Sequence, residues 1–238
     1  MCEPFTEFIY TYRKVKGFLF DALAINNYLI ITTWGEIINK RWLVIAVIIS
    51  YLFMLIGGAA LKPDYSHIAQ YISELNETGT PYSGIVSWLG FFLFGVLASV
   101  LLIVTACHAP VRGISRIGYW LLMAEPIAYI GSAFAPCDVG CPADGSLSQM
   151  IHNALAVLTI LSTTLGLFLL SFAPKISFLQ RVLWVGLTCL WQVTFVYMID
   201  DSMGEFRGLI QRIGEVVLYS ILCISAWRIL GTNSYLGR

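Results

Sequence analysis

The sequence predicts an all-α membrane protein, a bundle of six transmembrane helices preceded by an amphipathic helix that lies in the membrane interface. Three observations predict this class. The 238 residues are 58% hydrophobic and only 12% charged, whereas a soluble domain carries about 25% charged residues. The mean hydropathy of +0.78 leaves no room for a large aqueous domain. The apolar runs are long and unbroken, unlike the alternating strands of a membrane barrel.

Six segments approach the roughly 20 mostly apolar residues that a helix needs to cross a membrane. Their predicted bounds are 42–61, 84–107, 117–134, 150–172, 182–199 and 208–227. They form one transmembrane domain, 42–230, between an N-terminal segment, 1–41, and a cytoplasmic tail, 231–238. The connections are short, so successive helices should run antiparallel in a compact bundle.

The N-terminal segment carries a further apolar run at 17–34, which one aspartate and two asparagines interrupt. We interpret this run as a helix that lies in the membrane interface. A seventh span is the alternative, and it would place the basic cluster at 13–16 on the wrong side of the membrane. No cleavable signal peptide is predicted, because no compact apolar core precedes a small-residue cleavage site.

Basic residues predict the orientation, because cytoplasmic loops retain Lys and Arg. With a cytoplasmic N-terminus, eleven of the 14 Lys and Arg residues fall on the cytoplasmic side. The outer side holds the other three, Lys62, Arg207 and Arg212. We therefore expect a multi-pass protein of the bacterial inner membrane with both termini cytoplasmic. The lipid bilayer is the expected partner, protein partners are unknown, and the net charge of zero excludes a basic patch for nucleic acid.

The loop after the first span predicts a short amphipathic helix over 67–75. Its polar face would hold His67, Gln70 and Glu74, and its apolar face Ile68, Ile72 and Leu75. The polar face is either solvated above the mouth of the bundle or turned toward a cavity.

The third span contains a carboxyl group, Glu125, directly before Pro126 near the middle of the membrane. A charged carboxylate is costly there, so it should be protonated, paired or facing water. Tyr129 follows at i+4 on the same face, and Pro126 favours a kink because it cannot donate to the preceding turn. The carboxyl group is either a structural contact to a neighbouring helix or part of a functional site.

Two cysteines, Cys137 and Cys141, lie in the loop after the third span, on a side that is oxidising in bacteria. A disulfide is predicted, since the turn at Gly140 and Pro142 can bring the Cα atoms within the required distance of about 4.4–6.8 Å. The spacing fits a zinc pair poorly, and no second pair exists.

The last three spans also carry polar side chains. His152 begins the fourth span, and Gln192 lies in the middle of the fifth. In the sixth, Arg212 and Glu215 can pair at i and i+3, or Arg212 can hold an acidic group of a ligand. Such residues face other helices in a membrane, so we expect one polar cavity that opens outward. The residues expected to bind a ligand there are Ser73, Glu125, Tyr129, Gln192, Arg212 and Glu215.

Several short motifs follow one another in a recognisable order and spacing. They are Ile72-Ser-Glu-Leu75 after the first span, Pro136 and Asp138 at the end of the third, His152 at the start of the fourth, and Gln211-Arg212 and Trp227-Arg228 at the two ends of the last. In these motifs the chain resembles, over about 42–230, the bacterial and archaeal membrane family catalogued as "domain of unknown function 998". The resemblance implies a multi-helix membrane fold and no activity. Residues 1–41 and Cys141 depart from the pattern.

The most concrete functional hypothesis is a membrane-embedded enzyme that acts on a lipid or amphiphile. His67, Asp138 and His152 would ligate a divalent metal such as zinc. Glu74 would act as the general base beside these three catalytic residues. All four residues would have to converge on one outward-facing pocket from three separate segments.

Two alternatives stay open. The protein could be a transporter, channel or small-molecule receptor that uses Glu125 and the pair Arg212 and Glu215. It could also be a membrane assembly or regulatory protein without chemistry, whose polar residues only hold the bundle together. Against a secondary transporter, six spans without a visible repeat are few.

Overall fold

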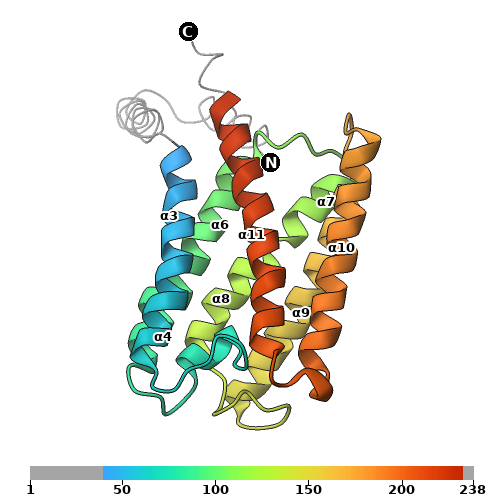
Figure 1. Ribbon diagram of the computed structural model, residues 1–238. Helices are drawn as coiled ribbons and strands as arrows, with labels where there is room; N and C mark the ends of the chain where they lie inside the picture. The colour runs from blue at the N-terminus through green and yellow to red at the C-terminus, as the bar shows by residue number, and fades with distance from the viewer. Residues whose placement is uncertain (1–39, 233–238) are drawn as a thin grey trace, which may run out of the picture.

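The computed structural model describes residues 40–232, and every regular element in that range is a helix (Figure 1). The positions 1–39 and 233–238 fall outside the described residues. The interfacial helix predicted over 17–34 and most of the predicted tail therefore lie outside them as well.

Five helices of the described chain are long and apolar enough to cross a membrane, so the chain is a multi-pass integral membrane protein. The first, Arg41–Leu61, consists of α3 (Arg41–Leu52), a π-helical turn η1 (Phe53–Gly57) and α4 (Gly58–Leu61). The second, Ser83–Ala106, consists of α5 (Ser83–Ile85), a π-helical stretch η3 (Val86–Phe92) and α6 (Leu93–Ala106). The others are α9 (Leu147–Leu170), α10 (Phe178–Ile199) and α11 (Arg207–Thr232).

The span predicted over 117–134 is not one helix but two, α7 (Ile114–Leu121) and α8 (Ala124–Phe134), which follow one another along the bundle (Figure 1). They have 8 and 11 residues, so neither is long enough to cross a membrane alone. The break has a local cause, because Pro126 has no N–H to donate to the Leu122 carbonyl. The Glu125 N–H donates to that oxygen instead, at 3.3 Å. Within the described residues, five helices are thus each long enough to cross a membrane alone, and the pair α7 and α8 occupies the segment predicted as the third span.

The helices pack side by side in a closed ring. α3 packs against α6 and α11, α6 against α8, α7 and α8 against α9, α9 against α10, and α10 against α11. α3 begins and α11 ends at the same end of the bundle (Figure 1). The loops 62–82, 135–146 and 200–206 lie at the opposite end, here called the loop end.

Serine caps begin two of the long helices. The Ser146 hydroxyl oxygen accepts the Gln149 N–H at 3.2 Å at the start of α9. At the start of α10, Ser177 and Gln180 form a reciprocal capping box, with distances of 3.2 and 2.7 Å. Each cap satisfies backbone donors that have no partner within the helix.

The outside of the ring is apolar, as contact with lipid requires. Within α10, only Leu187 and Trp191 are buried, and large side chains such as Leu183 and Val193 are exposed. A continuous exposed apolar surface of this kind marks an interaction with membrane or protein rather than with water.

The prediction of an amphipathic helix over 67–75 is wrong. Only Ile72–Asn76 is helical in this loop, and it forms a short 3-10 helix, η2. The Ser66 hydroxyl oxygen accepts the backbone N–H groups of Ile68 and Ala69, at 3.3 and 3.2 Å. Such local side-chain bonds compete with helix formation. Ile68 is consequently 51% exposed, whereas Ile72 is buried.

Hydrogen bonds join the two longer loops of the loop end, and one ion pair closes the first of them. The Thr78 N–H donates to the Cys137 carbonyl oxygen at 2.8 Å, and the Gly140 N–H donates to Glu77 Oε2 at 2.8 Å. Glu77 also pairs with Lys62 at 2.7 Å, with both side chains buried. The loops therefore form one connected layer over this end of the ring.

We predict that the contact between α7 and α9 depends on two facing glycines. A Cβ atom at Gly118 would lie 2.7 Å from the Gly166 carbonyl oxygen and 2.7 Å from Leu169 Cβ. Gly118→Ala should therefore lower stability by about 1–3 kcal/mol, measured as a drop in melting temperature in detergent. Gly186→Ala is the matched control, since nothing lies within 4 Å of its added Cβ. Equal melting temperatures for both variants would contradict the close packing.

Candidate functional site

A buried carboxylate, Glu215 of α11, forms the centre of the polar interior. Its Oε2 accepts hydrogen bonds from the hydroxyl of Tyr51 on α3, at 3.2 Å, and from that of Tyr129 on α8. Its Oε1 accepts a hydrogen bond from Gln211 Nε2 at 3.1 Å. Three accepted bonds and no donated bond are the pattern of an ionised carboxylate. One side chain thus joins three helices of the ring.

A second buried carboxyl group, Glu125 of α8, lies close enough to Glu215 for the two to interact electrostatically. Its Oε1 is 3.4 Å from Thr163 Oγ1 of α9. Neither carboxyl group forms an ion pair with a cation within residues 40–232. A second charge beside Glu215 would be costly in a membrane interior, so the contacts favour Glu125 as the neutral acid of the pair.

Arg212, three residues before Glu215, does not pair with it as the spacing suggested. Its Nη1 donates to the backbone oxygens of Gln70 and Gly208, at 2.9 and 2.8 Å. Its Nη2 donates to the Tyr65 hydroxyl. Burial raises the pKa of Tyr65 to about 12 although the Arg212 charge lowers it, so this hydroxyl remains protonated. Arg212 therefore anchors the first loop of the loop end to α11.

A third tyrosine of the interior, Tyr219 of α11, has a buried hydroxyl group without a hydrogen-bond partner among the described residues. Its ring packs against those of Tyr51 and Phe94, with centroid distances of 5.6 and 5.0 Å. Buried polar groups are nearly always hydrogen-bonded, and an unpaired one costs about 1–3 kcal/mol. This hydroxyl therefore marks a position where a polar group from outside the chain would be stabilising.

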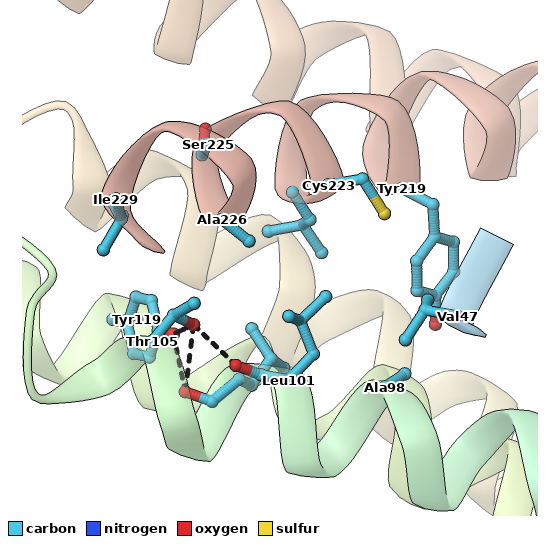
Figure 2. A pocket seen from close by; sticks show the side chains of 12 residues that line it. Val47, Ala98, Leu101, Thr105, Tyr119, Tyr219, Cys223, Ser225, Ala226 and Ile229 are labelled. Carbon is cyan, nitrogen blue, oxygen red and sulfur yellow. Dashed lines mark hydrogen bonds between the residues drawn. The ribbon is translucent and has the colours of Figure 1, made fainter. Parts of the chain in front are cut away.

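Two cavities meet at Tyr219. The larger, about 280 Å³, is a groove between α3 and α11 whose lining includes Tyr51, Tyr219 and Cys223. The smaller, about 40 Å³, lies deeper in the ring, with Tyr219 at one end and the hydrogen-bonded Thr105 and Tyr119 at the other (Figure 2). The groove thus reaches from the lipid-facing surface to Tyr51 and Tyr219, beside the Glu215 cluster.

The four predicted catalytic residues have separate surroundings. His67 is exposed at the loop end, and its ring packs edge-on to Tyr65 at 5.3 Å. Partial desolvation, together with the charge of Arg212, lowers the pKa of His67. Glu74 is instead buried, and its carboxylate accepts hydrogen bonds from the Tyr71 N–H at 2.9 Å, Gln70 Nε2 at 2.8 Å and Arg207 Nη2 at 3.1 Å. All three donors belong to the protein, so the Glu74 carboxylate is engaged in hydrogen bonds within the fold.

Asp138 is hydrogen-bonded to Ser146, the residue directly before α9. Its Oδ2 accepts the Ser146 N–H at 2.7 Å, and its Oδ1 accepts the Ser146 hydroxyl at 2.8 Å. These bonds hold the pKa of Asp138 below its usual range. His152, in the second turn of α9, is buried, with Nδ1 3.1 Å from the Ala135 carbonyl oxygen.

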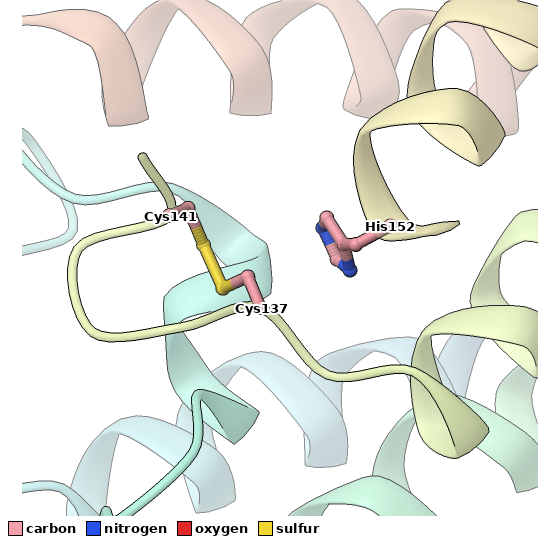
Figure 3. A group of neighbouring side chains, drawn as sticks. All are labelled: Cys137, Cys141 and His152. Atoms are coloured by element: carbon pink, nitrogen blue, oxygen red, sulfur yellow. A yellow bond between two sulfur atoms is a disulfide. The ribbon is translucent and has the colours of Figure 1, made fainter. Parts of the chain in front are cut away.

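The metal site predicted from His67, Asp138 and His152 is not assembled. Among the described residues, one group of potential ligands lies within 4.8 Å, and it comprises Cys137, Cys141 and His152 (Figure 3). The two cysteines form a disulfide, with their Cα atoms 5.1 Å apart. His67 and Asp138 do not join His152 in a metal site. The Asp138 carboxylate is hydrogen-bonded to Ser146, and His67 lies at the exposed surface.

The residues predicted to bind a ligand divide among four places, and Arg212 occupies one of them, where it holds the first loop as described above. Glu125, Tyr129 and Glu215 come together in the ring, as described above. Gln192 of α10 accepts a hydrogen bond from Thr164 of α9 at 2.8 Å. Ser73 lies at the loop end, where its Oγ is 3.4 Å from Cys141 Sγ. None of the six predicted residues lines either of the two cavities described above.

A family model described as "Protein of unknown function (DUF998)" matches residues 44–228. The chain belongs to the DUF998 family. The match begins within α3 and ends within α11, so the DUF998 region includes parts of every helix of the ring, the whole groove lining and all of the smaller cavity's lining except Ile229. Comparisons with curated proteins and with solved structures give no significant match.

Two residues of this DUF998 site, Tyr51 and Gln211, were not among those predicted from the sequence. Tyr51 is a lone aromatic hydroxyl in an otherwise apolar first span, and it closes the cluster from α3. The Gln211 side chain bridges the first loop and the Glu215 cluster. Its Oε1 accepts the Ile72 N–H at 2.8 Å, and its Nε2 donates to Glu215. A polar side chain inside a predicted span was the available signal, but the sequence does not show that both side chains reach Glu215.

We predict that Glu215→Leu destabilises the DUF998 ring. It would leave the hydroxyls of Tyr51 and Tyr129 without an acceptor, at a cost of about 1–3 kcal/mol each. Glu215→Gln should cost less, because its amide oxygen still accepts. Melting temperatures in detergent measure both, with Glu205→Leu at an exposed position as the control. A Glu215→Leu variant as stable as the control would show that the cluster does not hold the helices.

Proposed function

We propose that this DUF998 protein binds an amphiphile that enters sideways from the bilayer through the groove between α3 and α11. The observation that carries the proposal is the buried, unpartnered hydroxyl of Tyr219, a residue that lines that groove. The hydrocarbon part would lie in the groove. The polar part would hydrogen-bond to Tyr219.

The mouth of the groove supports a ligand from the membrane. Ile48, Leu52, Val216 and Ile224 line it and are also exposed on the outer surface of the ring. Side chains of this kind offer only apolar contact, which suits an acyl or isoprenoid chain. The volume of about 280 Å³ is close to the lower limit of small-molecule sites, about 300 Å³.

The charge of the cluster suggests which polar group is accepted. Glu215 has the hydrogen-bond pattern of an anion, and Tyr51, which lines the groove, donates to it. A second anion beside Glu215 would be repelled. A hydroxyl or amide can instead donate to Tyr219 or accept from it, because a phenol does both. Neutral amphiphiles are therefore expected to bind better than anionic ones.

This proposal is closest to the small-molecule receptor or transporter considered from the sequence. It retains the lipid or amphiphile of the enzyme hypothesis, but it includes no metal-dependent step, since His67, Asp138 and His152 are not brought together. A purely structural role for the polar residues explains Glu215 and Glu74, whose hydrogen bonds are all made within the chain. It does not explain the Tyr219 hydroxyl.

We further propose six membrane crossings in the bacterial inner membrane, with both termini cytoplasmic and the loop end outside. α3 begins and α11 ends at the same end of the ring (Figure 1), so the chain must cross an even number of times between them. Five long helices give an odd number. α7 and α8 together supply the sixth crossing, and the basic residues support a cytoplasmic position for the termini.

Photo-crosslinking tests the ligand site. A neutral lipid with a diazirine on its chain should label peptides of α3 and α11 that line the groove, mapped by mass spectrometry. Ser220→Trp should abolish that labelling, because Ser220 is exposed in the groove and indole would fill it. Val193→Trp, on the lipid-facing side of α10 outside the groove, should leave the labelling unchanged. Equal labelling of α10 and the groove, or labelling unaffected by Ser220→Trp, would refute the site.

Thiol labelling in intact cells tests the orientation. The background should lack the free thiols Cys189 and Cys223. In it, a membrane-impermeant maleimide should react with a cysteine introduced at Ser146, at the loop end, and not with one at Arg116. Both positions are exposed, so accessibility within the protein does not decide the result. Reaction at Arg116 alone would invert the proposed topology.

A further inference from the structure

The geometry points to a redox-gated metal site at the loop end, in which Cys137, Cys141 and His152 bind a zinc-like divalent ion once their disulfide is reduced. This site is distinct from the metal site predicted from sequence, and it does not depend on the proposed amphiphile. It is built from the loop before α9 and from the second turn of α9 itself (Figure 3).

The three ligand atoms are already close to a coordination geometry. The cysteine Sγ atoms and a ring nitrogen of His152 all lie within 4.8 Å of one another. Zinc binds thiolate at about 2.3 Å and imidazole at about 2.0–2.1 Å in a tetrahedron, so its ligand atoms are about 3.5–3.8 Å apart. Once the sulfur–sulfur bond is broken, movements of about an ångström would place a metal ion between the three side chains.

His152 is oriented as a metal ligand would be. Its Nδ1 lies 3.1 Å from the Ala135 carbonyl oxygen, and a carbonyl can only accept, so Nδ1 carries the proton. Nε2 of the neutral ring then keeps its lone pair, and it has no hydrogen-bond partner in the described chain. Metal-bound histidines almost always donate their other ring N–H in this way. Figure 3 shows the His152 ring directed from α9 toward the disulfide.

The surroundings favour binding of a metal by thiolates. Cys137 and His152 are buried, and Cys141 is partly buried, so few water molecules compete for the ion. Ser73 Oγ lies 3.4 Å from Cys141 Sγ, beside the position that a fourth ligand would occupy. Three protein ligands and one open position are the arrangement of reactive rather than closed zinc sites.

A dithiol reductant would open the site by thiol–disulfide exchange. Its thiolate attacks Cys141 Sγ, the more accessible sulfur, and forms a mixed disulfide while Cys137 leaves as thiolate. The second thiol of the reductant then attacks the mixed disulfide and releases Cys141. The reductant becomes a cyclic disulfide, so two electrons and two protons pass to the protein thiols. Binding of the metal afterwards releases these two protons to solvent.

Cobalt(II), a spectroscopic substitute for zinc, tests the site in the full-length protein in detergent. After anaerobic reduction with a phosphine, which competes little for the metal, cobalt should produce a thiolate-to-metal charge-transfer band. The untreated, disulfide-bonded protein should give no such band. Cys137→Ser should abolish it, and His152→Ala should weaken cobalt binding by more than about tenfold.

Matched controls separate this site from adventitious binding. His67→Ala, which removes an exposed histidine at the same end of the ring, and Cys223→Ser, which removes a buried thiol of α11, should leave the band unchanged. A band that survives His152→Ala at full affinity overturns the inference. So does the absence of a band in the reduced wild-type protein.

A second measurement needs no variant, in case His152→Ala fails to fold. Zinc should protect Cys137 and Cys141 of the reduced wild-type protein from a membrane-permeant alkylating reagent. It should not protect Cys189, a free thiol exposed on the lipid-facing side of α10. Peptide mass spectrometry reads each cysteine separately. Equal alkylation of all three with and without zinc would refute the site.

Discussion

The hydrogen bonds that converge on Glu215 set the arrangement of the ring. In a membrane, a buried carboxylate must be satisfied by the chain, since no water competes for it. Tyr51 and Tyr129 reach it from α3 and α8, so these two helices must present their tyrosines inward at the level of α11. The break before α8 contributes to this arrangement, because it gives Glu125 and Tyr129 a helix whose direction is set independently of α7.

The groove between α3 and α11 follows from the same constraint. Tyr51 and Tyr219 pack against each other at the back of the seam between these helices, where Ser220 and Cys223 on α11 add little side-chain volume. Small residues do not fill the space that separates two helices held apart by aromatic rings. The polar cluster and the lateral opening are therefore two consequences of one packing arrangement.

Hydropathy was sufficient to predict the spans, because length and apolar composition are local properties of the sequence. It predicted a single helix over 117–134, where α7 in fact ends at Leu121 and α8 begins at Ala124, two residues before Pro126. The turn at Ser66 was missed for a similar reason, since a hydroxyl that binds nearby N–H groups outweighs an amphipathic pattern. Of the site, the sequence identified Glu125 and Glu215 as polar residues in spans. Their partner Tyr51 follows only from tertiary packing.

Hydrogen-bond partners separate the polar residues that maintain the fold from those that are available to bind. Glu74 and Asp138 were attractive as catalytic groups, yet their oxygens are occupied by Arg207, Ser146 and backbone donors. A group so engaged can bind a ligand only by giving up contacts that stabilise the fold. Within the described chain, the Tyr219 hydroxyl and His152 Nε2 are not engaged in this way. They lie in different parts of the molecule, one behind the groove between α3 and α11 and the other under the loop end, so they are suited to two separate ligands.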